Sequence, residues 1–169
     1  YNSAYLQNVI SVFMILFGIN FNAYFLLLTR KFKQLFKIEE IRVYLGVIAV
    51  FTTLIAFNVR GCFGSLRESF HHSLFQVASI ITTTGFSTVD FNQWPAFSKL
   101  LLVLLMFIGA CAGSTGGGMK CSRILLLFKG VKKEMMSLIH PRLVRVHKMD
   151  GQRVQHEVMR SVNAFLVAY

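Results

Sequence analysis

Charged residues are scarce in this chain of 169 residues. They make up 15% of the sequence, with only seven Asp and Glu, whereas apolar residues make up 54%. Soluble domains typically carry about 25% charged residues and about 45–50% apolar ones. The composition therefore argues against a disordered chain and against an ordinary soluble enzyme.

Cysteine is also rare. The chain has three, Cys62, Cys111 and Cys121, an odd number without C-x-x-C spacing. This pattern supports neither a disulfide framework nor a zinc site. We interpret the three residues as small buried hydrophobic side chains.

Basic residues are absent before Arg30 and unevenly distributed after it. Five lie in 30–42 and ten in 120–160. The net charge of +11 fits either nucleic acid or an anionic membrane surface as a partner. Because the charges cluster beside apolar stretches, we expect membrane lipids and no nucleic acid. Cytoplasmic loops are enriched in Lys and Arg, so 30–42 and 120–160 are predicted to be cytoplasmic and 58–99 external.

Three uncharged stretches are long enough for a membrane helix, at 9–29, 43–59 and 100–119. A bilayer core about 30 Å thick needs about 20 helical residues. All three stretches predict membrane spans. Asn20 and Asn22 interrupt the first one, either as interhelical hydrogen-bonding groups or as the lining of an aqueous path.

A shorter helix is predicted over 66–81. Ser65 and Glu68 match the S-x-x-E capping box that precedes a helix. Sixteen residues extend only about 24 Å at 1.5 Å per residue, which favours a re-entrant helix over a crossing one. His71 and His72 lie near its start, and we interpret them as interfacial rather than as a metal pair.

An extended segment, Thr82 to Thr88, follows this helix. Its β-branched threonines disfavour further helix, and Gly85 permits a positive φ. In such a run the carbonyl oxygens can replace the hydration shell of a monovalent cation. The alternative is a polar kink buried between helices.

The third apolar stretch contains five glycines and is predicted to break midway. A flexible loop over 109–118 could gate a pore beneath a filter. Gly109 and Gly113 also form a GxxxG packing pattern. Gly113 and Gly118 have the spacing of a Walker A phosphate loop, but Met119 and Lys120 stand where that loop requires Lys and then Ser or Thr. Ser114 could serve a membrane hydrolase only if a histidine reached it.

The segments that follow are predicted from charge and turn residues. Lys120 and Arg123 are either cytoplasmic anchors or charges that tune cation passage at the gate. His140 and Pro141 are predicted to end the next helix. Asp150 and Gly151 give a weak hairpin signal.

Two motifs together resemble the Trk/Ktr potassium-uptake family, most closely its TrkH type. They are Ser79-Ile-Ile-Thr-Thr-Thr-Gly-Phe-Ser-Thr88 and Gly109-Ala-Cys-Ala-Gly-Ser-Thr-Gly-Gly-Gly-Met-Lys120. The resemblance implies an all-α membrane protein with four membrane helix–pore loop–membrane helix repeats around one pore. It also implies potassium uptake across the bacterial inner membrane by a multi-pass protein that is not an enzyme.

The resemblance also implies a role for each segment. The chain is interpreted as a fragment, with 1–29 as the last helix of the second repeat, 30–40 as a basic cytoplasmic loop, 41–137 as the third repeat, 138–155 as a cytoplasmic linker and 156–169 as the start of the fourth repeat. Within 41–137 the predicted parts are a helix at 41–59, a pore helix at 66–81, a filter at 82–88, and a broken helix at 99–108 and 119–137 around the gate loop 109–118.

The site residues implied by the resemblance belong to the filter and the gate. The filter quarter is Thr83, Thr84, Gly85 and Phe86, with potassium, the transported ion, at Thr83 and Thr84 and no covalently bound cofactor. The gate loop is carried by Gly109, Gly113, Ser114, Thr115, Gly116, Gly117 and Gly118, with Lys120 and Arg123 as gate-adjacent charges.

The resemblance further implies a homodimer bound to a cytoplasmic regulatory subunit of the TrkA type, which binds nucleotide or NAD. The basic segment 129–153 is the expected docking face. Two other functions stay open from the residues: a hydrolase that uses Ser114, and a membrane interaction module without transport.

Overall fold

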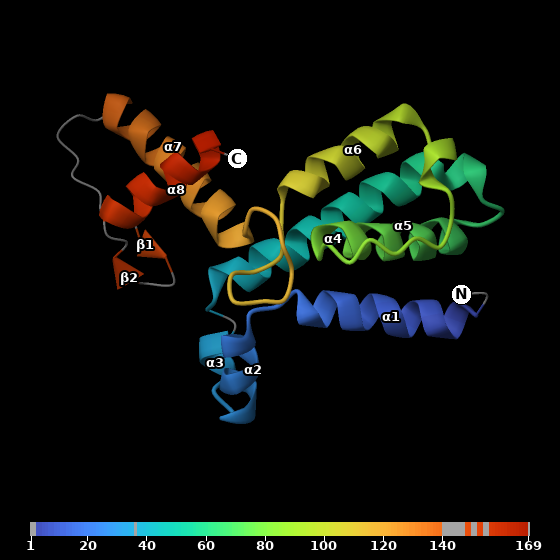
Figure 1. Cartoon of the computed structure of the whole chain (residues 1–169), viewed down its shortest axis with the longest axis horizontal. Helices are drawn as coiled ribbons and strands as arrows, with labels where there is room; N and C mark the ends of the chain where they lie inside the picture. The colour runs from blue at the N-terminus through green and yellow to red at the C-terminus, as the bar shows by residue number, and fades with distance from the viewer. Residues whose placement is uncertain (1–2, 36, 140–147, 150–151, 154–155, 169) are drawn as a thin grey trace.

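The computed structural model describes residues 3–35, 37–139, 148–149, 152–153 and 156–168 (Figure 1). Within these residues the elements of regular secondary structure are helices, apart from two strands of two residues each. The predicted all-α class is confirmed.

The first apolar stretch is bent. It contains α1 (Ala4–Phe17) and α2 (Phe21–Leu28), which meet at 93°. The prediction of one continuous spanning helix over 9–29 is therefore wrong. Asn20 is the N-cap of α2, and its side-chain oxygen accepts a hydrogen bond from the Asn22 N–H at 2.8 Å. This capping role restarts the helix in a new direction.

Gly18 lies at the bend, where Tyr44 occupies the space that a side chain at position 18 would need. A Cβ atom on Gly18 would lie 2.1 Å from the Tyr44 hydroxyl oxygen and 2.8 Å from Cζ of its ring. The Tyr44 hydroxyl donates to the Ile15 carbonyl oxygen at 3.2 Å. The break is thus held by a helix that follows much later in the sequence.

Tyr44 belongs to α4 (Glu39–Asn58), which is the long apolar helix of the described chain. It continues into the short helix η1 (Val59–Cys62), and the 24 residues Glu39–Cys62 are enough to cross a membrane by length and composition. The bent pair α1 and α2 passes the same test only when counted as one span. A short helix, α3 (Phe32–Leu35), lies in the basic loop before α4.

α5 (Leu66–Ile81) has the bounds predicted for the re-entrant helix. It packs against α1, α4 and α6 (Ala96–Phe107), and η2 (Phe91–Gln93) lies in the return loop to α6 (Figure 1). The main core consists of apolar side chains from these helices, including Tyr44, Ile48, Ile55, Val77, Ile81, Leu102 and Leu105. The core fixes the end of α5, from which the predicted filter starts.

The third apolar stretch is interrupted, as predicted. α6 ends at Phe107, and α7 (Cys121–Ile139) begins after a loop that lies at the junction of α1, α2, α4 and α7 (Figure 1). Gly113 and Gly118 have φ of 69° and 70° in this loop. Side chains strongly disfavour that region of φ, so these glycines make the path possible.

The last part of the chain carries a second helix pair. α7 ends at Ile139, directly before the predicted stop at His140. β1 (Lys148–Met149) pairs antiparallel with β2 (Gln152–Arg153), in agreement with the hairpin signal. α8 (His156–Ala168) packs on α7 through Leu126 and Val162. Most of the predicted linker 138–155 lies outside the described residues.

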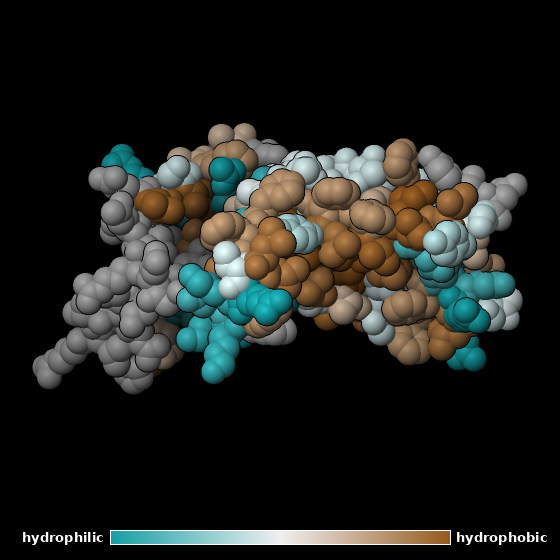
Figure 2. All heavy atoms as spheres, turned by 90° about the horizontal axis from the view of Figure 1, so that it is seen from below, coloured by the Kyte–Doolittle hydropathy of each residue, from teal (hydrophilic) through white to brown (hydrophobic). Residues whose placement is uncertain are grey.

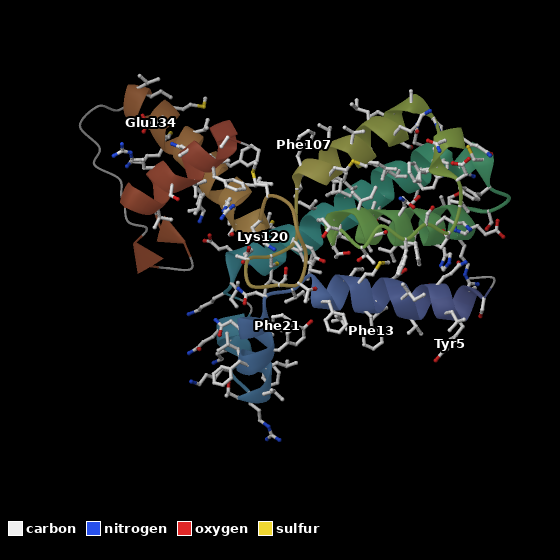
Figure 3. All side chains as sticks on the ribbon, viewed as in Figure 1. Tyr5, Phe13, Phe21, Phe107, Lys120 and Glu134 are labelled. Carbon is white, nitrogen blue, oxygen red and sulfur yellow. The ribbon has the colours of Figure 1, made fainter. Side chains whose placement is uncertain are left out.

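Large apolar side chains are exposed on the outside of the helices. Figure 2 shows one face of the molecule on which many hydrophobic residues lie side by side, together with hydrophilic patches. On α1 and α2 they include Tyr5, Val12, Phe13, Phe17, Phe21, Phe25 and Leu28. Tyr5, Phe13 and Phe21 point away from the helix bundle (Figure 3). Such a surface is suited to lipid or to further membrane helices.

Candidate pore loop and gate loop

The predicted filter segment is held by the last turn of α5. The Ser79 carbonyl oxygen accepts hydrogen bonds from the N–H groups of Thr84 (2.9 Å) and Gly85 (3.4 Å). The buried Ser79 hydroxyl donates to the Phe86 carbonyl oxygen at 2.6 Å. Sequence reasoning gave Ser79 no role, although it carries three of the bonds that shape this segment.

Two residues of the segment lie in the left-handed region of φ. Thr83 has φ 56° and Gly85 has φ 81°. A Cβ on Gly85 would meet no atom within 4 Å. Glycine is therefore favoured there by the backbone conformation and not by a lack of room. A β-branched residue at positive φ is strained and persists only where its surroundings hold it.

Thr83 is held by its hydroxyl group. That hydroxyl donates to the Thr82 carbonyl oxygen at 2.7 Å and accepts from the Gly117 N–H at 2.8 Å. The second bond comes from the predicted gate loop. The structure therefore brings together the two motifs that the sequence analysis identified separately.

The two ends of the predicted gate loop form its neck, which is closed by backbone hydrogen bonds. The Gly109 N–H donates to the Met119 carbonyl at 2.7 Å, and the Cys121 N–H donates to the Ala110 carbonyl at 3.1 Å. A Cβ on Gly109 would lie 2.4 Å from the Gly117 carbonyl oxygen. Gly109 therefore permits a close approach of the two ends, in addition to any role as a packing glycine.

The bend between α1 and α2 supports the other side of the loop. The Cys111 N–H donates to the Gly18 carbonyl at 3.0 Å, and the Phe21 N–H donates to the Gly113 carbonyl at 3.1 Å. The Thr115 hydroxyl donates to the Phe17 carbonyl at 3.2 Å. Bending the first helix exposes backbone groups that pair with the loop, which explains why the two irregular segments lie together.

Ser114 lies in the loop without the partners of a nucleophile. Its hydroxyl donates to the Cys111 carbonyl oxygen at 2.6 Å. Both histidines with described side chains are engaged elsewhere: His71 Nε2 lies 2.6 Å from Gln7 Oε1, and His72 Nδ1 lies 2.9 Å from Thr88 Oγ1. Among these residues nothing supports the hydrolase alternative.

The two gate-adjacent charges have different surroundings. The Lys120 ammonium group donates to the Gly116 carbonyl oxygen, near the tip of the loop, and Lys120 lies at the central junction (Figure 3). The Arg123 guanidinium lies 4.0 Å from the ring centroid of Phe165 on α8, a cation–π contact. Lys120 is thus part of the loop structure, whereas Arg123 joins α7 to α8.

Glu40 is a buried charged residue that the sequence analysis did not single out. It is 3% exposed, and its Oε1 accepts from the N–H groups of Ala112 (2.6 Å) and Ser122 (3.0 Å). These partners lie 72 and 82 residues away along the chain. No local sequence pattern could have indicated the contact.

The family model described as TrkH, cation transport protein, matches residues 1–169. The chain belongs to the TrkH family.

Individual TrkH-family relatives agree over the full chain. The potassium uptake protein TrkH of Escherichia coli K12 is 35% identical over 173 residues, and that of Vibrio parahaemolyticus is 38% identical over 176 residues. The E. coli protein TrkG is 36% identical over 174 residues. These matches cover 100% of this chain but 35–36% of each relative, so the chain spans about a third of their length.

A solved structure of the TrkH family gives the same fold. The crystal structure of the potassium transporter TrkH from V. parahaemolyticus superposes with a TM-score of 0.91 at 33% identity, covering 100% of this chain and 37% of that chain. This agreement confirms the potassium-channel-like membrane fold. The relatives are named as transporters and not as enzymes, in agreement with the prediction that this chain is not an enzyme.

Proposed function

We propose that this chain forms one quarter of a potassium filter together with the loop that gates it, within an uptake protein of the bacterial inner membrane. The observation that carries the proposal is the hydrogen bond from the Gly117 N–H to the Thr83 hydroxyl. It places the tip of a glycine-rich loop against the predicted filter. A loop in that position can obstruct ions that leave the filter.

The filter itself would act through backbone carbonyl groups. The segment 83–87 is exposed on this chain, and residues 69–89 contain no Asp, Glu, Lys or Arg. A site of carbonyl dipoles suits a monovalent cation that must be dehydrated and released again. The C-terminal end of α5 adds a partial negative charge directly before Thr82. We assign potassium, as transported substrate, to the level of Thr83 and Thr84.

The remaining quarters of the pore would come from other repeats of the same protein. In this proposal residues 1–29 end the second repeat, 41–137 form the third, and 156–169 begin the fourth. The complete membrane protein is a homodimer that binds a cytoplasmic subunit with a nucleotide or NAD site. The basic segment 129–153 is the proposed docking face for that subunit.

Rubidium uptake tests the filter assignment. The full-length parent protein is expressed in a bacterium that lacks its own potassium uptake systems. Gly85→Ser should lower the rubidium-over-sodium ratio about tenfold or more, because serine disfavours the φ of 81° and shifts the carbonyl groups. Gly46→Ala is the matched control, since a Cβ there meets nothing within 4 Å. An unchanged ratio in Gly85→Ser contradicts the filter assignment.

The gate assignment has a separate test. Deleting residues 113–117 removes the tip that touches Thr83, and it should raise rubidium flux in the absence of the regulatory subunit. Ser114→Ala should leave uptake unchanged, because the Ser114 hydroxyl bonds only within the loop among the described residues. Equal or lower flux after the deletion, in protein that remains monodisperse in detergent, would count against a gate.

A further inference from the structure

Two neighbouring glutamates at the start of α4 have different environments. Glu39 forms an ion pair with Lys129 of α7, and about a third of its side chain is exposed. Glu40 is 3% exposed. A charged side chain is rarely buried to that extent unless it is paired or hydrogen-bonded. The buried carboxylate of Glu40 accordingly has hydrogen-bond partners.

Glu40 joins the two ends of the gate loop. Its Oε1 accepts from the Ala112 N–H at 2.6 Å, in the first half of the loop, and from the Ser122 N–H at 3.0 Å, where α7 starts. Ser122 is in the first turn of α7, where unpaired N–H groups and the helix dipole favour an anion. Both hydrogen bonds are assisted by the charge of the carboxylate and are stronger than neutral ones.

The two hydrogen bonds of Glu40 differ from the backbone hydrogen bonds at the neck. The Gly109–Met119 and Cys121–Ala110 backbone bonds connect the loop only to itself. Glu40 instead connects the neck to α4, a helix of the main core. Among the described residues, one hydrogen bond, from the Gly117 N–H to the Thr83 hydroxyl, joins the loop tip to the filter segment. Glu40 therefore ties the neck to α4, in addition to the Cys111–Gly18 bond that ties it to the bend between α1 and α2.

We propose that Glu40 is a positioning residue for gating: its carboxylate fixes the neck of loop 109–118 to α4 and so keeps the tip against the filter. The proposal rests on the proposed function of the loop. Loss of the carboxylate removes the hydrogen bonds between the neck and α4, and the tip then leaves Thr83 more easily. Glu40 touches no transported ion in this role and acts only through the loop.

The experiment compares three variants of the full-length protein without its regulatory subunit. Glu40→Ala removes both acceptor bonds and should raise basal rubidium flux about tenfold, as loss of hydrogen bonds to a charged group predicts. Glu40→Gln retains one oxygen acceptor without charge and should give a smaller increase. Glu39→Gln is the matched control from the same helical turn and should leave the basal flux unchanged.

Thiol labelling provides a readout that does not depend on transport. Cys111 is fully buried beside Ala112 in the loop neck. Its labelling by a small maleimide should become about tenfold faster in Glu40→Ala and remain slow in Glu39→Gln, since exposure of a buried group follows the opening equilibrium. Each rate is measured on protein that is monodisperse in detergent. If Glu40→Ala does not fold, Glu40→Gln carries both measurements.

Several outcomes would overturn the proposal. Wild-type flux and wild-type Cys111 labelling in both Glu40 variants would show that the carboxylate does not hold the gate. An equal increase in Glu39→Gln would indicate a general effect of removing negative charge. If deletion of 113–117 raises flux and the Glu40 variants do not, the role of Glu40 fails while the proposed gate stands; if the deletion has no effect, the gate itself fails.

Discussion

At the scale of single residues, the glycines of this chain serve two physical purposes. Gly85, Gly113 and Gly118 have positive φ, which only glycine adopts readily. Gly18 has an ordinary helical φ of −73° but lies against Tyr44. The first kind is suggested by glycine-rich motifs. The second kind depends on a side chain that the local sequence does not contain.

Replacing Gly18 tests the second purpose. Gly18→Ala should destabilise the protein by about 1–3 kcal/mol, because the new methyl group would overlap the Tyr44 hydroxyl and force a rearrangement. Thermal unfolding in detergent measures the effect. Gly46→Ala lies in open space on α4 and should be neutral or slightly stabilising. Similar melting temperatures for the two variants would contradict the packing seen at the bend.

Only some residues of the candidate site could be predicted from the sequence. The threonine and glycine runs indicated Thr83, Gly85 and the loop glycines. Ser79 and Glu40 were missed, since a serine in a helix and a glutamate beside another glutamate carry no distinctive pattern. Their roles arise from hydrogen bonds across tight turns or across the fold.

At the scale of elements, local signals fixed the start of α5. The Ser65 hydroxyl oxygen accepts from the Glu68 N–H at 3.2 Å, which is the first bond of the predicted capping box. The helix bounds agree with the prediction because cap, apolar spacing and the threonine run all act within a few residues. The bend of 93° between α1 and α2 was missed because hydropathy alone does not report direction.

Removing the cap should weaken α5. Ser65→Ala is expected to lower stability by about 1 kcal/mol, because the Glu68 N–H loses its acceptor. Ser3→Ala is the matched control, since Ser3 is the N-cap of α1 and makes no side-chain capping bond. Thermal unfolding of the two variants gives the comparison. A loss in Ser3→Ala equal to that in Ser65→Ala would show that the cap contributes nothing specific.

At the scale of the whole molecule, orientation in the membrane follows from charge and has a direct test. Cys111 and Cys121 are buried as expected, but Cys62 is exposed at the end of η1, so the interpretation of all three cysteines as buried is wrong for Cys62. Cys62 lies in the segment 58–99 that is predicted to be external. In cells, a membrane-impermeant maleimide added outside should label Cys62 and spare the other two. The test uses full-length protein whose cysteines outside this chain are replaced by serine.

Two variants complete the labelling test. Cys62→Ser should abolish external labelling and should leave rubidium uptake unchanged. Labelling of Cys62 only after the cells are permeabilised would reverse the predicted orientation and would place the basic segments 30–42 and 120–160 outside.

The sequence by itself determined the membrane class, the position of the main helices, the short α5 and the break in the third apolar stretch. These features depend on hydropathy, on caps and on glycine, which act over a few residues. Tertiary structure alone decided that α1 and α2 bend apart, that Tyr44 occupies the bend, that Glu40 joins both ends of the loop and that Gly117 touches Thr83. Each of these contacts needs partners 26 or more residues apart to be brought together by packing, and no local pattern encodes that proximity.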